Sequence, residues 1–531
     1  MKSFFEVFIL SFFVYGCCYF PGRILIERFN FKKEEKFVLS FAISCFLFYI
    51  FGFLGYVINA KPFIFNGLLL LLILFYCFFY ILKNKFFFEE LNLYFFLCFL
   101  FLIFYQSFIP FYSGGMWFFD WFEHYFRTII FLDKLSLNIS FQGYIIPSRP
   151  PFFNLVCYFF QSIIGKDFYK YQIISTFLNS LLILSVYLFC KGALKIENKN
   201  LFLFTFFILF FNPYILRQIT YTWTKSFSAY YTLCGLYFYI KFMENKDRFY
   251  LYFSPFLFGC GFIVHYSAGP YILPIIFHFL YNVYKEKKLV SEFLIFNLIF
   301  SLLIFTYFSW SIRNFGIYNT FLSNTTFQGQ KNLIFKERIE KDINNFFKTI
   351  FPVIPKSFIS IYQPYKFFKF RFYNYILPLY SSNILGNLTF TLSVFLVFIF
   401  LKNIKKFKFK KDFWSFFILF SFFLALIVNP TKDLCGVAHV SYLPFVCLIL
   451  SYVIREILKF NKRRIVLTVF LLETISFFFF QLHIFNSYFN LKEIISLWRT
   501  TGLEAAHLGN FLLKYNNKLT FLYDKFFSDF Q

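Results

Sequence analysis

Long hydrophobic runs separated by short polar segments dominate this chain. Most runs are about twenty residues long, the length an α-helix needs to cross roughly 30 Å of hydrocarbon. The pattern predicts about fourteen membrane-spanning helices, at 4–21, 37–58, 63–82, 92–110, 168–190, 201–216, 226–243, 249–266, 268–283, 291–310, 379–401, 413–428, 441–458 and 465–485. We therefore expect an all-α polytopic membrane protein.

Two segments between these runs predict structure outside the bilayer. The apolar stretch 152–164 follows Pro150-Pro151 and ends at Gly165, and it is too short to span. It favours a helix lying in the membrane interface, above a cavity made by the outer ends of the spans near 216, 265 and 310. The polar segment 311–378 predicts a second outer loop with short helices, one of them near 332–349.

The chain divides into three regions by this pattern. Residues 1–91 form N-terminal transmembrane helices, and 92–485 form a transmembrane core that carries the outer loops 111–167 and 311–378. Residues 486–531 form an outer C-terminal tail.

Charge distribution gives the orientation. The 531 residues carry a net charge of +26, with 59% hydrophobic and 15% charged residues, and a mean hydropathy of +0.64. Lys and Arg recur in the short loops 22–36, 83–85, 191–199, 241–248, 284–288, 402–412 and 455–464, all on one side of the predicted spans. Such loops are typical of the cytoplasmic face, not of a nucleic-acid-binding surface. We expect a multi-pass protein of a bacterial inner (plasma) membrane, with its chemistry on the extracytoplasmic side.

The cysteines do not indicate a disulfide framework or a metal site. Nine of the eleven lie inside predicted spans, Cys157 lies in the apolar stretch 152–164, and only Cys435 lies in a polar outer loop. We therefore interpret them as small buried apolar residues. A divalent cation is compatible with paired carboxylates, but Asp120 and Glu123 alone make a thin ligand set. We expect no metal and no cofactor.

The first large outer loop gathers the candidate catalytic residues Asp120, Glu123 and His124. Ionisable groups at the end of a membrane span are costly and therefore indicate a functional site. Partial desolvation raises the basicity of a carboxylate, which suits Asp120 to deprotonate an acceptor. The structural alternatives are an N-cap for Asp120, an i to i+4 pair with Arg127 for Glu123, and a hydrogen-bonded interfacial side chain for His124.

Arg149 precedes two prolines, which bias its backbone to an extended form and present it rigidly at a helix start. A guanidinium matches the oxygen pair of a phosphate in geometry and charge. The alternative is an anchor for lipid headgroups. Lys225, His265, Arg313 and His439 stand at other outer span ends and are further candidates for binding a donor phosphate.

These residues together resemble the GT-C superfamily, with family 39 and the aminoarabinose-transferase-like enzymes as the nearest pattern. The resemblance rests on the outer acidic Asp120, the Arg149-Pro150-Pro151 segment before an apolar helix ending in Gly165, Trp310-Ser311-Ile312-Arg313-Asn314, and the segment from His439 to Pro444. It implies a catalytic place for Asp120 and a phosphate-contacting place for Arg149. Asp120 is followed by Trp121, where many relatives carry Glu, and three more spans precede this loop than in typical members.

The resemblance implies a glycosyltransferase that moves a sugar from a polyprenyl-phosphate donor to a glycolipid, glycan or protein acceptor. Two alternatives stay open on sequence alone: a flippase for lipid-linked oligosaccharides, and an O-antigen polymerase or ligase. A flippase favours charges in mid-span and two related halves, whereas here the charges gather at outer span ends.

Overall fold

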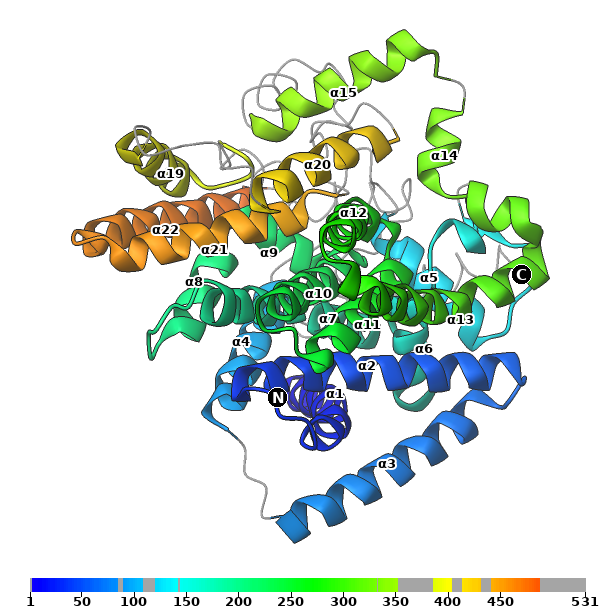
Figure 1. Ribbon diagram of the computed structural model, residues 1–531. Helices are drawn as coiled ribbons and strands as arrows, with labels where there is room; N and C mark the ends of the chain where they lie inside the picture. Colours follow the sequence, from blue (N-terminus) through cyan, green and yellow to red (C-terminus); the bar gives the residue numbers. More distant parts are fainter. Residues whose placement is uncertain are drawn as a thin grey trace.

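α-Helices make up nearly all of the computed structural model, which describes residues 2–84, 89–107, 120–141, 144–331, 333–351, 385–403, 413–430 and 441–487 (Figure 1). The predicted all-α class is confirmed within these residues: the strands described are the two-residue pair β1 (Ser140–Phe141) and β2 (Tyr144–Ile145), joined antiparallel.

The helices of the N-terminal half follow the hydrophobic runs closely. They are α1 (Lys2–Ile26), α2 (Lys33–Val57), α3 (Pro62–Asn84), α4 (Glu90–Ser107), α5 (Asp120–Leu132), the 3₁₀ turn η2 (Ile146–Ser148), α6 (Phe152–Ile164), α7 (Phe168–Leu188) with the π-helical turn η3 (Phe189–Ala193), α8 (Leu201–Phe210), α9 (Pro213–Thr220) and α10 (Lys225–Asn245).

The C-terminal half continues the bundle and adds α14 and α15 at its periphery (Figure 1). Its elements are α11 (Arg248–Val264), η4 (Tyr266–Ala268), α12 (Gly269–Lys285), η5 (Lys287–Leu289), α13 (Val290–Leu322), α14 (Thr325–Gln330), α15 (Phe335–Ile350), α19 (Phe390–Asn403), α20 (Phe413–Val428), α21 (Leu443–Lys459) and α22 (Arg463–Ser487). The helix expected near 332–349 is therefore present as α15.

The centre of the bundle is formed by α7 and α10, which are buried along almost their whole length. Helices that are covered on every side need no polar face, and the polar groups they carry bond to neighbouring backbone. Asn179 of α7, for example, donates to the carbonyl oxygen of Trp223 at 2.9 Å. Close helix approach depends on small residues: a Cβ at Gly22 of α1 would lie 1.9 Å from the carbonyl oxygen of Ser40 in α2.

Length and composition support fewer independent spans than predicted. Among the described residues, five helical segments are long and apolar enough to cross a membrane, within α1, α2, α3, α7 and α13, or six if α8 and α9 form one bent span. Other predicted spans, such as α4, α11, α19 and α20, are apolar but shorter. The count of about fourteen crossings stays a prediction.

Three predicted spans have different bounds in the structure. The run 201–216 is broken into α8 and α9, which meet at 89°, because Pro213 starts a new helix and the Asn212 side chain caps it by accepting from the N–H groups of Tyr214 and Ile215. α13 extends beyond 310 to Leu322, with a break at Gly316 (φ 78°). In the run 379–401 the helix starts only at Phe390, and 379–384 lies outside the described residues.

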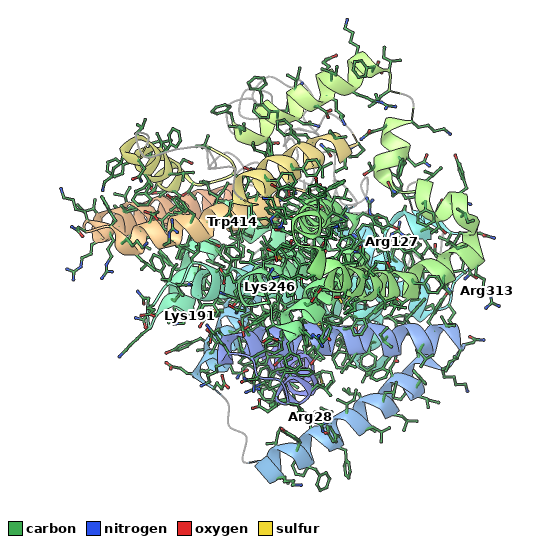
Figure 2. All side chains as sticks on the ribbon, viewed as in Figure 1. Arg28, Arg127, Lys191, Lys246, Arg313 and Trp414 are labelled. Atoms are coloured by element: carbon green, nitrogen blue, oxygen red, sulfur yellow. The ribbon has the colours of Figure 1, made fainter. Side chains whose placement is uncertain are left out.

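Two helix ends that the sequence predicts to be outer, those of α2 and α13, lie close together. Tyr49 bonds to Thr306 and Phe53 packs on Trp310, so α2 and α13 run parallel and end on the same side. Figure 2 places Arg127 and Arg313, from segments predicted to be outer, at the right of the view, and Lys191, from a predicted inner loop, at the left. Which side faces the cytoplasm stays a prediction.

Candidate active site

Helix α5 carries the three candidate catalytic residues. Asp120 is the first residue of α5, and its side chain lies outside the described residues. Glu123 and His124 follow within one turn and are buried. α5 is amphipathic and packs against α6. The polar residues Glu123 and His124 therefore lie on the same short helix as apolar residues of the core.

A buried ion-pair cluster joins α5 to the segment before α6. Glu123 Oε1 lies 2.9 Å from Arg127 Nη2, and Arg127 Nε donates to the same oxygen at 3.0 Å. Arg149 Nε lies 3.6 Å from that oxygen. The carboxylate of Glu123 therefore contacts two guanidinium groups. The i to i+4 pairing of Glu123 with Arg127 is confirmed, and it coexists with a contact to Arg149.

Arg127 also fixes the backbone that leads to Arg149. Its Nη1 donates to the carbonyl oxygen of Ile146 at 2.9 Å, and its Nη2 donates to Ser148 Oγ at 2.9 Å. Ser148 Oγ in turn donates to the carbonyl oxygen of Ile145 at 2.7 Å. The turn η2 is thus held by a buried charge, and Arg149 leaves it in a defined direction.

Arg149 has the extended backbone that the following proline predicts, with φ −134° and ψ 131°. Pro151 then takes the N-cap position of α6. The Arg149 side chain is 16% exposed, and its guanidinium carbon lies 5.8 Å from the ring centre of Tyr144. The rigid presentation inferred from the sequence is therefore present, with Glu123 and Tyr144 as its supports.

His124 is held in the protein interior. Its Nδ1 lies 3.5 Å from Asn154 Oδ1, and Asn154 Nδ2 donates to the His124 carbonyl oxygen at 2.5 Å. Burial is the main cause that lowers the pKa of His124 to about 4. The imidazole is therefore neutral at neutral pH. This environment matches a hydrogen-bonded structural side chain more closely than a charged imidazole that donates a hydrogen bond to a phosphate.

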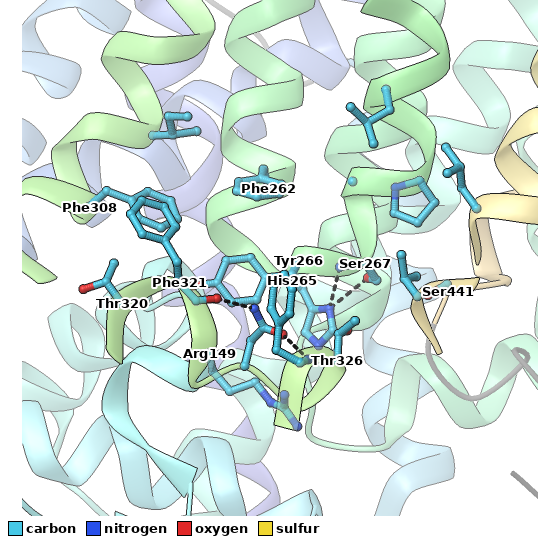
Figure 3. Close-up of a pocket in the computed structure, with 18 of the residues that line it drawn as sticks. Arg149, Phe262, His265, Tyr266, Ser267, Phe308, Thr320, Phe321, Thr326 and Ser441 are labelled. Carbon is cyan, nitrogen blue, oxygen red and sulfur yellow. Dashed lines mark hydrogen bonds between the residues drawn. The ribbon is translucent and has the colours of Figure 1, made fainter. Parts of the chain in front are cut away.

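A cavity of about 700 Å³ opens beside Arg149. Its walls come from the outer ends of α11, α12 and α13, from the segment 320–327, and from α20. Apolar side chains dominate them, namely Phe262, Leu273, Ile304, Phe305, Phe308, Ile312, Phe321, Phe327, Leu424 and Val428. Polar groups are few, and Arg149 is the charged one among the described lining residues. Figure 3 draws Arg149 on the side of Tyr266 and His265, with Phe262 and Phe308 farther along the cavity.

His265 ends α11 and contributes to this polar end. Its Nδ1 accepts from the backbone N–H of Ser267 at 3.0 Å and lies 2.9 Å from Ser267 Oγ. The next residue, Tyr266, donates from its hydroxyl to the carbonyl oxygen of Pro147 at 3.2 Å. This bond links the α11–α12 turn to the Arg149 segment.

Two of the other predicted donor-binding residues, Lys225 and Arg313, do not line this cavity. Lys225 starts α10 and is buried, with Nζ 3.5 Å from the ring centre of Trp223. Arg217 lies 4.9 Å from the same ring. Arg313 is exposed on α13 and does not line the cavity. His439 lies outside the described residues.

The position of α6 corrects one expectation about the cavity. α6 has the predicted bounds, but eleven of its thirteen residues are buried, against α2, α3, α5 and α7. None of the described cavity-lining residues belongs to α6 or lies near 216. The cavity instead uses Thr320 and Phe321, because α13 turns back at Gly316 so that Thr320 Oγ1 meets Ser311 Oγ at 2.9 Å. The sequence signal for this turn is the lone Gly316 after the hydrophobic run.

No three His, Cys, Asp or Glu side chains gather in metal-binding geometry within the part of the chain that the structure describes. The expectation that no metal or cofactor takes part stays an expectation, since Asp120 lies partly outside that region.

Comparison with known proteins gives a match to one family over part of the chain. Residues 148–310 match the family model described as dolichyl-phosphate-mannose-protein mannosyltransferase. The matched segment is thus similar to a family of membrane glycosyltransferases of the GT-C type. The match covers less than a third of the chain, from Ser148 to the outer part of α13, and so includes Arg149, Lys225 and His265 but not α5. No curated protein matches the chain.

Proposed function

We propose that this protein is a glycosyltransferase that moves a sugar from a polyprenyl-phosphate donor to a glycolipid, glycan or protein acceptor on the extracytoplasmic side of a bacterial inner membrane. The observation that carries the proposal is the pairing of one cation, Arg149, with a cavity of about 700 Å³ whose walls are otherwise mainly apolar. A lipid phosphate needs both at once: apolar surface for the isoprenoid chain and a fixed cation for the phosphate.

The two guanidinium groups of the cluster have different neighbours. Glu123 lies against both Arg127 and Arg149. Arg127 is directed at the η2 carbonyls and Ser148, whereas Arg149 lines the cavity. Arg149 is therefore the residue that would bind the phosphate, with Glu123 and Arg127 as positioning residues. His265 lines the same end and would contact the phosphate or the sugar.

The reaction needs one base and one stabilised leaving group. An acceptor hydroxyl or amine would attack the anomeric carbon while the bond from that carbon to the phosphate oxygen breaks. The acceptor proton would pass to the carboxylate of Asp120, and the lipid phosphate would leave with its charge held by Arg149. We keep Asp120 as the proposed base because it is the first residue of α5, less than one helical turn before Glu123.

The donor class has independent support from the family description, which names a dolichyl-phosphate-linked sugar. The same description favours transfer over the flippase alternative. Lys225, Arg313 and His439 remain proposed donor contacts at a second rank, since Lys225 and Arg313 do not line the cavity.

Transfer of label tests the proposal directly. Membranes containing the protein would be given a panel of polyprenyl-phosphate sugars with tritiated sugar, and label would be followed into lipid, glycan and protein fractions. We expect transfer from one donor into one fraction, and a loss on the order of 10²–10⁴-fold in Asp120→Asn, because the variant lacks a general base. Transfer by Asp120→Asn at the wild-type rate would exclude Asp120 as the base.

Sidedness has its own test. Gln328 on α14 is exposed in a predicted outer segment and Lys199 is exposed in a predicted inner loop. The ten described native cysteines are buried, so a background in which only Cys435 is replaced by Ser suffices. Gln328→Cys should react with an impermeant maleimide in intact spheroplasts, and Lys199→Cys only after the membrane is opened. The reverse pattern would contradict the extracytoplasmic site.

A further inference from the structure

Helix α15 turns an apolar stripe away from the protein. Phe335, Ile339, Ile343 and Phe347 are spaced four residues apart and therefore share one face. Their exposed fractions are 79%, 44%, 54% and 56%, respectively. Figure 1 places α15 at the periphery of the molecule, beyond α20.

The opposite face of α15 is polar and is the one that contacts the protein. Lys341 is buried, and its Nζ donates to the carbonyl oxygens of Asn429 at 2.7 Å and Ile427 at 3.3 Å. Asn345 and Thr349, one and two turns further on, are buried on the same face. An amphipathic helix on a water-soluble protein has the reverse orientation, with its apolar face inward. The orientation of α15 therefore requires an apolar environment on its outer side.

The helix it rests on carries an exposed apolar surface of the same kind. Phe346 of α15 packs on Phe422 of α20, with ring centres 5.9 Å apart. α20 is itself apolar throughout and leaves Phe416, Leu419, Phe423 and Ile427 exposed at spacings of three and four residues. In a membrane glycosyltransferase such a stripe on an apolar helix faces lipid. The apolar face of α15 is thus continuous with a helix that is already suited to the bilayer.

The charges around the stripe fit the lipid–water boundary. Residues 331–350 contain five basic and three acidic side chains, an excess of two positive charges. Lys336, which is exposed, lies beside the stripe, where a long aliphatic chain can follow the apolar surface while its ammonium group reaches the headgroups. A basic, strongly amphipathic helix is the form that binds a membrane surface.

We propose that α15 is a lipid-contacting helix whose stripe of Phe335, Ile339, Ile343 and Phe347 is buried in the bilayer. Its polar face then holds the outer end of α20 through Lys341. Because Leu424 and Val428 of α20 line the cavity, lipid contact at α15 supports one wall of that cavity. The proposal rests on the membrane location of the protein and not on the identity of the donor.

Site-specific photo-crosslinking tests this contact in the full-length protein. p-Benzoylphenylalanine would be placed at Ile343 in the stripe, and at Asn344 as the matched control, one residue on and about 100° further round the helix. Leu72 of α3, which is 67% exposed, serves as the reference for a lipid-facing side chain. Expression and gel-filtration profiles would confirm that each variant folds. The protein would be irradiated in native membranes and its adducts identified by mass spectrometry.

We expect lipid adducts at Ile343 in a yield within about twofold of Leu72, and at least fivefold fewer at Asn344. Equal lipid adducts at Ile343 and Asn344 would overturn the proposed orientation of α15. Crosslinked protein dimers at Ile343 would identify a second copy of the chain as the occupant, and no adduct at Ile343 would mean a water-exposed stripe. Either result would overturn lipid contact.

Discussion

Two buried cationic regions lie at the predicted outer ends of the helices, and the described groups that contact their cations differ. At the start of α6, Arg127 and Arg149 share the carboxylate of Glu123, and Arg127 also meets backbone carbonyls. At the start of α10, Lys225 and Arg217 lie against the ring of Trp223. The first region opens onto the apolar cavity through Arg149, whereas neither cation of the second lines it.

The difference teaches that basic residues at predicted span ends can have very different surroundings. Arg149 is directed by a carboxylate and by a proline-fixed backbone toward a space that a ligand can enter. Lys225 stacks on an aromatic face, which stabilises a cation within the fold. The following predictions separate a ligand-binding cation from a structural one.

The largest expected effect comes from breaking the ion-pair cluster. Arg127→Met leaves Glu123 without its nearest partner and removes the donors that hold η2, so the protein should lose about 3–5 kcal/mol of stability. Equilibrium unfolding in mixed micelles would measure it. Arg313→Met, which removes an exposed guanidinium, should change stability by no more than about 0.5 kcal/mol. Equal changes in the free energy of unfolding for the two variants would mean that the ion-pair cluster does not stabilise the fold.

A pH-dependent effect follows from His124. Its folded pKa of about 4 lies below the usual value, so the unfolded chain binds more protons between about pH 6.5 and pH 4. The stability contribution is complete above pH 6.5 and is lost as the pH falls through this window, by about 3 kcal/mol in total. His124→Gln should therefore show a flatter decline of unfolding free energy than wild type. Parallel curves for the two proteins would contradict the burial of a neutral imidazole.

The next effect separates catalysis from folding. Arg149→Gln removes a charged hydrogen-bond donor to the phosphate, worth about 1.5–3 kcal/mol, so kcat/KM for the donor should fall about 10- to 150-fold. KM should rise as well, because the phosphate is charged before and during transfer. Arg464→Gln, which changes an exposed guanidinium on the first turn of α22, should leave both constants unchanged. A fall in kcat alone would argue against ground-state phosphate binding.

The smallest expected effect concerns the second region, around Trp223. Lys225→Met removes a cation from the face of Trp223 and should lower stability by about 0.5–2 kcal/mol. Its effect on donor kcat/KM should be clearly smaller than that of Arg149→Gln. A loss of activity as large as the one expected for Arg149→Gln would place Lys225 in the donor site and remove the distinction between the two regions.

Local sequence patterns predicted the elements well and the site in part. Pro150-Pro151 predicted both the extended Arg149 and the start of α6, and the i to i+4 spacing predicted the Glu123–Arg127 pair, because these depend on neighbours in the chain. The cavity could not be predicted in the same way. Its walls join Arg149 to residues more than a hundred positions later, and they depend on the turn at Gly316. The orientation of α15 could not be predicted either. Its sequence predicts an amphipathic helix but does not say which face contacts the protein.

Donor-lipid binding tests the central claim, that Arg149 binds the donor phosphate in the apolar cavity, most directly. Thermal unfolding of the purified protein would be measured with polyprenyl phosphate and with the matching polyprenol, which lacks the phosphate. A ligand at a hundred times its Kd stabilises the folded state by about 2.7 kcal/mol. The account predicts that polyprenyl phosphate stabilises the wild type much more than polyprenol does, and that Arg149→Gln abolishes the difference. Equal stabilisation by the two lipids, or an unchanged preference in Arg149→Gln, would contradict it.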